Sequence, residues 1–137
     1  MKTLITILFL SLLSSPSWSV YIYDFVEREG VYYKKFSDVP FTGEIDGELI
    51  KGSMKNGKQE GEWISYSPNG QLRSKGNYKN GKEEGAWVHY WSNGQLDFKG
   101  NYKNGKSEGA WVGFEEDGRV KEFMTGTFKN GVKIRKD

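Results

Sequence analysis

The chain repeats itself with a constant period, which separates Gly61 from Gly85 and again Gly85 from Gly109. The sequence GNYKNG at residues 76–81 recurs at residues 100–105, and EGAWV at residues 84–88 recurs at residues 108–112. A related version, EGEWI, occupies residues 60–64. A constant period of this length is typical of a tandem array in which each repeat is one small supersecondary unit.

Each repeat contains two turn signals. Glycine follows asparagine or aspartate at seven regularly spaced positions, namely Gly57, Gly70, Gly81, Gly94, Gly105, Gly118 and Gly131. Asn-Gly and Asp-Gly pairs favour the positive backbone angles of tight hairpin turns. The segments between the turns are too short for a capped helix. The sequence therefore predicts an all-β fold, an elongated antiparallel meander of tandem β-hairpin repeats of about 24 residues each.

Composition narrows the range of functions. The 137 residues include 20 basic and 18 acidic ones, which gives a formal net charge of +2. This balance argues against nucleic acid as a partner, because lysine and glutamate alternate and form no strongly basic patch. The chain has no cysteine, so disulfides, thiol nucleophiles and cysteine-based zinc sites are excluded.

Three regions are predicted along the chain. Residues 1–19 have the features of a secretory signal peptide: Lys2 at the start, an apolar stretch over residues 4–13, and small residues before a cleavage site. The alternative is a buried first helix. A signal peptide implies export, to the periplasm or the extracellular space. Residues 20–40 are predicted to form an N-terminal β segment that caps the array, and residues 41–137 to form the repeat domain.

A strand register follows if Asn93 and Gly94 form a two-residue hairpin loop. Trp91 then faces Leu96, His89 faces Phe98, and Trp87 faces Gly100 on one side of the sheet. An indole opposite a glycine would fill the space that the missing side chain leaves and would cover the backbone. In the third unit, two extra residues within 119–125 predict a β-bulge.

The sequence gives little sign of catalysis. His89 is the only histidine, and the register places Asp97 on the opposite face from it, so we expect no catalytic site, metal site or cofactor. Glutamate and lysine also recur with the repeat. We interpret them as ion pairs stacked along one edge of the array rather than as paired catalytic carboxylates; they are Glu60, Glu84, Glu108, Lys58, Lys82 and Lys106.

Aromatic residues of the middle repeat break the pattern. Residues that only hold a repeat together should recur with it, but Ser65 and Gly113 occupy the positions equivalent to His89. We predict a binding site of five residues, Trp87, His89, Trp91, Leu96 and Phe98. Aromatic anchors dominate protein interfaces, which favours a contact patch for a partner. The alternative is local packing under the N-terminal cap.

The repeat motif resembles the MORN repeat family. The pattern Tyr-Lys-Asn-Gly-Lys-x-x-Gly-x-Trp-x-x-Tyr-x-x-Asn-Gly-x-Leu is most similar to the bacterial variant found in proteins labelled YwqK-like antitoxin components, over residues 41 to about 133. The resemblance implies a β-hairpin array and a non-enzymatic protein–protein interaction module, with an antitoxin-like or immunity role as one form. The alternative is binding to the cell-envelope surface, through membrane lipid headgroups or glycan. A hydrolytic enzyme is a third class, for which the sequence offers no convergent polar site.

Overall fold

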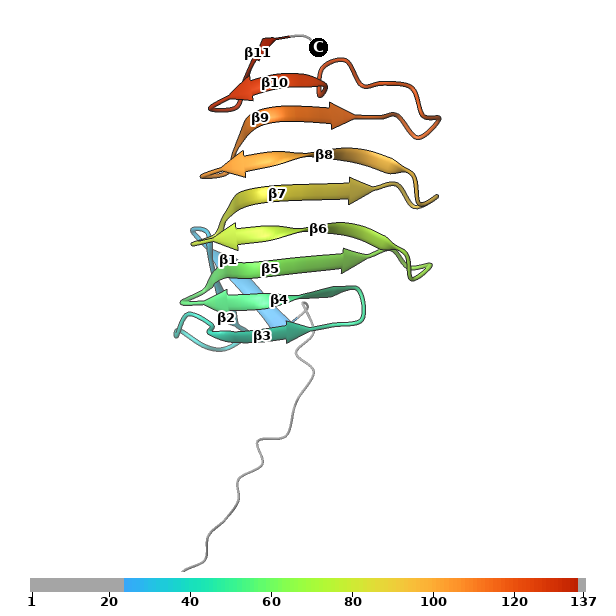
Figure 1. Cartoon of the computed structure of the whole chain (residues 1–137). Helices are drawn as coiled ribbons and strands as arrows, with labels where there is room; N and C mark the ends of the chain where they lie inside the picture. Colours follow the sequence, from blue (N-terminus) through green and yellow to red (C-terminus); the bar gives the residue numbers. More distant parts are fainter. Residues whose placement is uncertain (1–23, 136–137) are drawn as a thin grey trace, which may run out of the picture.

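The computed structural model describes residues 24–135, and the predicted signal peptide at residues 1–19 lies outside them. Within the described residues there is no α-helix, and the chain forms eleven strands (Figure 1). They are β1 (Phe25–Arg28), β2 (Val31–Lys34), β3 (Gly43–Asp46), β4 (Ile50–Lys55), β5 (Lys58–Tyr66), β6 (Leu72–Lys79), β7 (Lys82–Tyr90), β8 (Leu96–Lys103), β9 (Lys106–Gly113), β10 (Gly126–Lys129) and β11 (Val132–Arg135).

Strands β3 to β11 form one antiparallel sheet in which every strand pairs with its neighbours in sequence. This order is the meander that the sequence predicts, and the all-β prediction is confirmed. Strands β1 and β2 form a separate hairpin, which lies behind the first strands of the sheet in Figure 1. Phe25 and Tyr32 of this hairpin pack against the buried cluster of Ile45, Met54 and Trp63.

Two kinds of turn alternate along the chain, one kind at each end of the strands. At one end of the strands Asn and Gly both have positive φ, for example 52° at Asn80 and 80° at Gly81, as the tight two-residue hairpin requires. At the other end of the strands only the glycine has positive φ, as at Gly94, where φ is 85°. There the Asn93 side chain accepts the Gln95 N–H at 2.9 Å, and Gly94 N–H donates to the Trp91 carbonyl.

The two-residue loop predicted at Asn93–Gly94 is therefore wrong. Trp91 N–H donates to the Gln95 carbonyl, so the loop holds three residues and Trp91 does not face Leu96. A register shift between His89 and Tyr90 then restores the predicted pairs His89–Phe98 and Trp87–Gly100. Asp97 is the extra residue of that shift, since Leu96 pairs with Tyr90 and Phe98 with His89.

The third unit also differs from the prediction. The chain leaves the sheet after Gly113 and returns only at Gly126, so residues 114–125 form an irregular segment instead of a bulged strand. A single bridge between Phe114 and Val120 lies within it. Lys121 N–H donates to the Gly113 carbonyl, which turns the segment back over the end of β9.

Candidate functional site

Each repeat tryptophan lies over a glycine of the preceding strand. A Cβ added to Gly76 of β6 would lie 2.1 Å from Cδ2 of Trp87 on β7, so only glycine leaves room for the ring. Trp87 Nε1–H donates to the Asn77 carbonyl at 3.1 Å. The sequence predicted the correct strand pair, Trp87 with Gly100, but it placed the indole over the wrong glycine.

A bulge in β7 explains the difference. Lys75 pairs with Val88 and Asn77 pairs with Glu84, so three residues of β7 lie opposite Gly76 alone. Gly85 in this bulge has a φ of 74°, which favours glycine. The widened gap lets the indole reach across to β6. The same arrangement recurs one period away on each side, with Trp63 over Gly52 and Trp111 over Gly100.

The tryptophans join the aromatic residues of neighbouring strands in a continuous aromatic row. Its members are Trp63, Tyr78, Trp87, Tyr102, Trp111 and Phe128, with successive ring centroids 4.8 to 6.2 Å apart. All of these contacts are edge-to-face, the geometry that aromatic pairs prefer. Burial in this row raises the pKa of the Tyr78 and Tyr102 hydroxyls. Trp63 and Trp111 are the buried members of the row, and the other four side chains are partly exposed.

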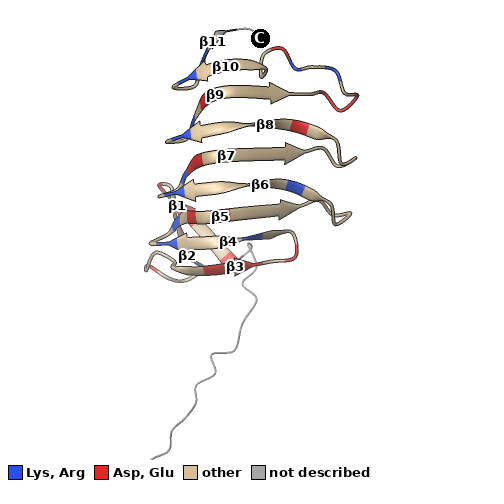
Figure 2. Ribbon diagram, viewed as in Figure 1, with Lys and Arg blue, Asp and Glu red and all other residues tan. Residues whose placement is uncertain are grey.

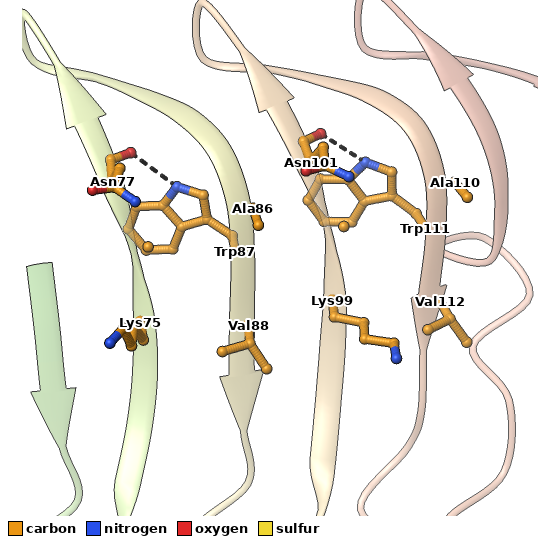
Figure 3. A pocket seen from close by; sticks show the side chains of 12 residues that line it. Lys75, Asn77, Ala86, Trp87, Val88, Lys99, Asn101, Ala110, Trp111 and Val112 are labelled. Carbon is orange, nitrogen blue, oxygen red and sulfur yellow. Dashed lines mark hydrogen bonds between the residues drawn. The ribbon is translucent and has the colours of Figure 1, made fainter. Parts of the chain in front are cut away.

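The other face carries a shallow groove of about 570 Å³ across strands β6 to β9 (Figure 3). Its alanines and valines flank Trp87 and Trp111 in sequence, so their side chains point the opposite way from the aromatic row. The lining residues include Lys75, Ala86, Val88, Lys99, Ala110 and Val112, and ring atoms of Trp87 and Trp111 also contribute to the lining. Figure 3 shows each indole spanning the gap between its strand and the preceding one. The groove is mainly nonpolar and contains the same chemical set twice.

Lysines alternate with β-branched residues across this face. The pairs are Lys51–Ile64, Ile64–Lys75, Lys75–Val88, Val88–Lys99 and Lys99–Val112. We call Lys51, Lys75 and Lys99, which follow one another at the period of the repeat, the lysine row. Lys51 forms an ion pair with Asp46 and Lys75 with Glu62, both at 2.9 Å. The hydrogen bond to Asp46 raises the pKa of the Lys51 ammonium.

The repeated glutamates cap turns and do not form the predicted ion pairs. Glu60, Glu84 and Glu108 accept the backbone N–H groups of Asn80, Asn104 and Asn130, respectively, at 2.8 to 2.9 Å. Each glutamate lies just after one tight Asn-Gly turn and caps the next tight turn along the chain. Within residues 24–135 no ion pair joins these glutamates to the repeated lysines. The glutamate carboxylate binds the turn N–H rather than a lysine because the N–H is fixed in position. An exposed lysine would lose side-chain entropy on forming the ion pair.

Residues 59–80 and 83–104 match the family described as the MORN repeat variant. The matched segments contain the indole–glycine contact, the glutamate-capped turn and the Asn-Gly hairpin. Residues 59–104 are MORN repeats. A comparison with curated proteins finds no match.

Within the second MORN repeat, the five predicted binding residues do not form one cluster. Trp87 belongs to the aromatic row. The His89 ring stacks on Phe98, with centroids 5.1 Å apart and planes 5° from parallel, and Phe98 in turn stacks on Trp111. Leu96 pairs with Tyr90. The fifth residue, Trp91, has different partners.

Trp91 anchors the irregular segment that follows the MORN repeats. Its Nε1–H donates to the Phe114 carbonyl at 3.0 Å. The Lys121 ammonium lies over its ring, 4.3 Å from the centroid. These contacts hold both ends of residues 114–121 against the residue that follows β7, which assigns Trp91 a structural role in the packing of this segment.

The same segment completes a polar cluster around Asp97. His89 Nδ1 lies 2.9 Å from Asp97 Oδ2, and Lys121 Nζ donates to Oδ1 at 2.6 Å. The Asp97 and Lys121 side chains are only 10% and 11% exposed. The prediction that Asp97 points away from His89 is wrong, because the extra residue in the β8 register turns its carboxylate toward the histidine.

Sequence reasoning missed Lys121. Arg73, Asp97 and Lys121 occupy the same position in three successive repeats. The change of charge at this position was the available signal. The cluster has one histidine, one carboxylate and one ammonium. In the described part of the chain, no group of three or more His, Cys, Asp or Glu residues is placed to hold a metal ion. Nor does that part include a helix long and apolar enough to cross a membrane.

Proposed function

We propose that this chain is a non-enzymatic interaction module that binds a segment of another protein in the groove. The observation that carries the proposal is the groove itself, a nonpolar hollow of about 570 Å³ lined by alanine, valine and lysine side chains and by Trp87 and Trp111. Val88 and Val112 lie in it two strands apart, on either side of the exposed Lys99. Nonpolar surface rimmed by polar groups is typical of sites that bind other proteins.

The rigidity of the groove supports this proposal. Its floor is held by the indole hydrogen bonds of Trp87 and Trp111 to backbone carbonyls, at 3.1 and 3.0 Å. A preformed surface loses little conformational entropy when a partner binds. Of the five residues predicted from the sequence, only Trp87 lines this groove. We retain the His89–Phe98 stack as a proposed second contact point.

The predicted signal peptide supports a role outside the cytoplasm. We therefore propose that the module is exported to the periplasm or the extracellular space. An immunity-like role, in which the groove captures a segment of a toxin, is one form of this function.

Site-specific photocrosslinking tests the proposal. A photoreactive residue at Ala110, which is exposed in the groove, should capture a discrete partner in the native cells, whereas the same residue at Gln95, in an exposed turn, should not. The partner is then purified and its affinity measured. We expect Val112→Arg in the groove to weaken binding, and Val120→Arg, at a 46% exposed residue of the irregular segment, to leave it unchanged. Equal affinities for the two variants would place the contact elsewhere.

A second candidate function, binding to an anionic surface, rests on the lysines that flank the tight Asn-Gly turns. At three of the four tight Asn-Gly turns, the flanking residues are lysines that face each other directly, in the pairs Lys55–Lys58, Lys79–Lys82 and Lys103–Lys106; at the fourth, Lys129 faces Val132. Figure 2 shows this end of the strands as a line of blue segments. Like charges in direct cross-strand pairs are unfavourable for folding. Their repetition suits an anionic envelope surface, such as phospholipid headgroups.

Salt separates the two functions. Attraction of the lysines that flank the tight turns to anionic vesicles should fall steeply as ionic strength rises, because exposed charges are screened. Capture in a nonpolar groove should respond less. Vesicle binding that is lost when Lys79 and Lys103 are both changed to Gln, with groove variants unaffected, would favour the envelope function.

A further inference from the structure

Lys99 differs from the two lysines that precede it in the lysine row. Lys51 and Lys75 each pair with a carboxylate at 2.9 Å. No carboxylate within residues 24–135 forms an ion pair with Lys99. The last lysine of the row therefore carries an uncompensated charge.

The cause is a single position of the repeat. Glu62, the partner of Lys75, lies one full repeat before Ala86, and Ala86 lines the groove beside Lys99. The repeat thus replaces a carboxylate by a methyl group at the point where the groove is formed. The change both removes the internal counter-charge and opens nonpolar surface.

The nonpolar surroundings of Lys99 strengthen the attraction of its charge for a group of opposite sign. Val88 and Val112 are its direct partners on the two adjacent strands, so the ammonium stem lies between two nonpolar side chains. Figure 3 shows Lys99 between these valines, with its side chain extending toward Val112. Nonpolar walls reduce the screening of a charge and favour a partner of opposite sign.

We infer that the groove binds a segment of a partner protein that presents one carboxylate side chain between two nonpolar ones. Lys99 pairs with the carboxylate, and the surfaces around Val88 and Val112 receive the nonpolar groups. The valines are two strand spacings apart, about 10 Å, which sets the span of the recognised segment. This inference rests on the proposed protein-binding function and adds to it the chemistry of the partner.

The test uses a display library of random linear peptides selected against the purified protein. We expect the selected peptides to share an Asp or Glu flanked by nonpolar residues. Binding of a selected peptide should weaken about fivefold in Lys99→Gln, the effect of losing one exposed ion pair. Replacing the acidic residue of the peptide by its amide should weaken binding to the wild type by a similar factor and should not weaken binding to Lys99→Gln further.

Ala86 provides a matched pair of variants. Ala86→Glu restores the carboxylate that the first repeat has and should occupy Lys99, so acidic peptides should lose affinity. The glutamine of Ala86→Gln has nearly the same volume as the glutamate of Ala86→Glu but carries no charge. This variant should keep the preference for acidic peptides over their amide forms. A circular dichroism spectrum of each variant checks that the sheet is intact.

The outcomes separate the inference from the function on which it rests. Selected peptides without acidic enrichment, bound equally by wild type and Lys99→Gln, would overturn the carboxylate assignment and keep the groove as a peptide site. A library that yields no binder would contradict both. Binding to vesicles containing phosphatidylglycerol that is lost in Lys99→Gln would overturn the assignment of a peptide as the occupant.

Discussion

Gly76 and Trp87 form the contact on which the repeat is built. The indole occupies the space of the missing side chain, with Cδ2 2.1 Å from where a Cβ would be. The ring nitrogen, at the same time, replaces part of the backbone ladder by donating to the Asn77 carbonyl. A glycine in the middle of a strand is thus required by the tryptophan of the next strand.

Gly76→Ala should destabilise the protein by about 1–3 kcal/mol, because the added methyl displaces the indole. The free energy of unfolding in urea measures this effect. In Trp87→Ala the same methyl has room, so the two substitutions together should cost less than their sum. Additive effects would show that the ring does not determine the glycine.

The pair of Asp97 and Lys121 should respond strongly to loss of one partner. Asp97→Asn leaves the mostly buried ammonium without its counter-charge, which should cost about 3–5 kcal/mol. Adding Lys121→Met should recover much of that loss. As a control, Asp38→Asn breaks the exposed pair with Arg28 and should change the free energy of unfolding by less than about 1 kcal/mol.

Trp91→Phe removes the hydrogen bond to the Phe114 carbonyl but keeps an aromatic ring beneath Lys121. We expect a loss of about 1 kcal/mol and faster hydrogen exchange at the amides of Glu115 and Lys121. Trp91→Ala should free the whole of residues 114–125. If neither variant changes exchange in this segment, Trp91 is available to a partner and the patch predicted from the sequence regains support.

Glu84→Ala should cost about 1 kcal/mol, since the Asn104 amide loses its acceptor. Lys82→Gln should change stability by less than about 0.5 kcal/mol, because the structure assigns this lysine no ion pair with the glutamates. The comparison distinguishes turn capping from the ion-pair row predicted from the sequence. A larger effect from the lysine than from the glutamate would reverse that assignment.

Stability should fall at alkaline pH. Burial raises the pKa of Tyr78 and Tyr102 in the folded protein above the ordinary value of 10.0. The unfolded chain therefore loses these protons first, so the stabilisation is complete below pH 10.0 and is lost as the pH rises through the folded values. Urea midpoints on the two sides of this pH measure the fall. Tyr102→Phe should make it smaller, and an unchanged fall would exclude this tyrosine as its cause.

The sequence predicts the meander because Asn-Gly turns and a constant period are local signals. It also predicts the strand pairs of Trp87 and His89. Parity arguments fail at the bulges of Gly85 and Asp97, because an extra residue changes which side chains share a face and which neighbour a ring can reach. These bulges depend on contacts between strands, and the side chains alone do not reveal them. The groove was not predicted either, because its nonpolar lining depends on Ala86 and Ala110, which gave no sequence signal of their own.

Each of the three glutamates lies just after one tight Asn-Gly turn and caps the next, so every capped turn depends on a residue beside the turn before it. For the first Asn-Gly turn, the Asn56 N–H donates instead to the hydroxyl of Thr42, ahead of the repeats. The array consequently has a direction. Whole repeat units could be inserted or deleted without leaving a turn uncapped, and evolution could change the length of the binding surface only in increments of about 10 Å.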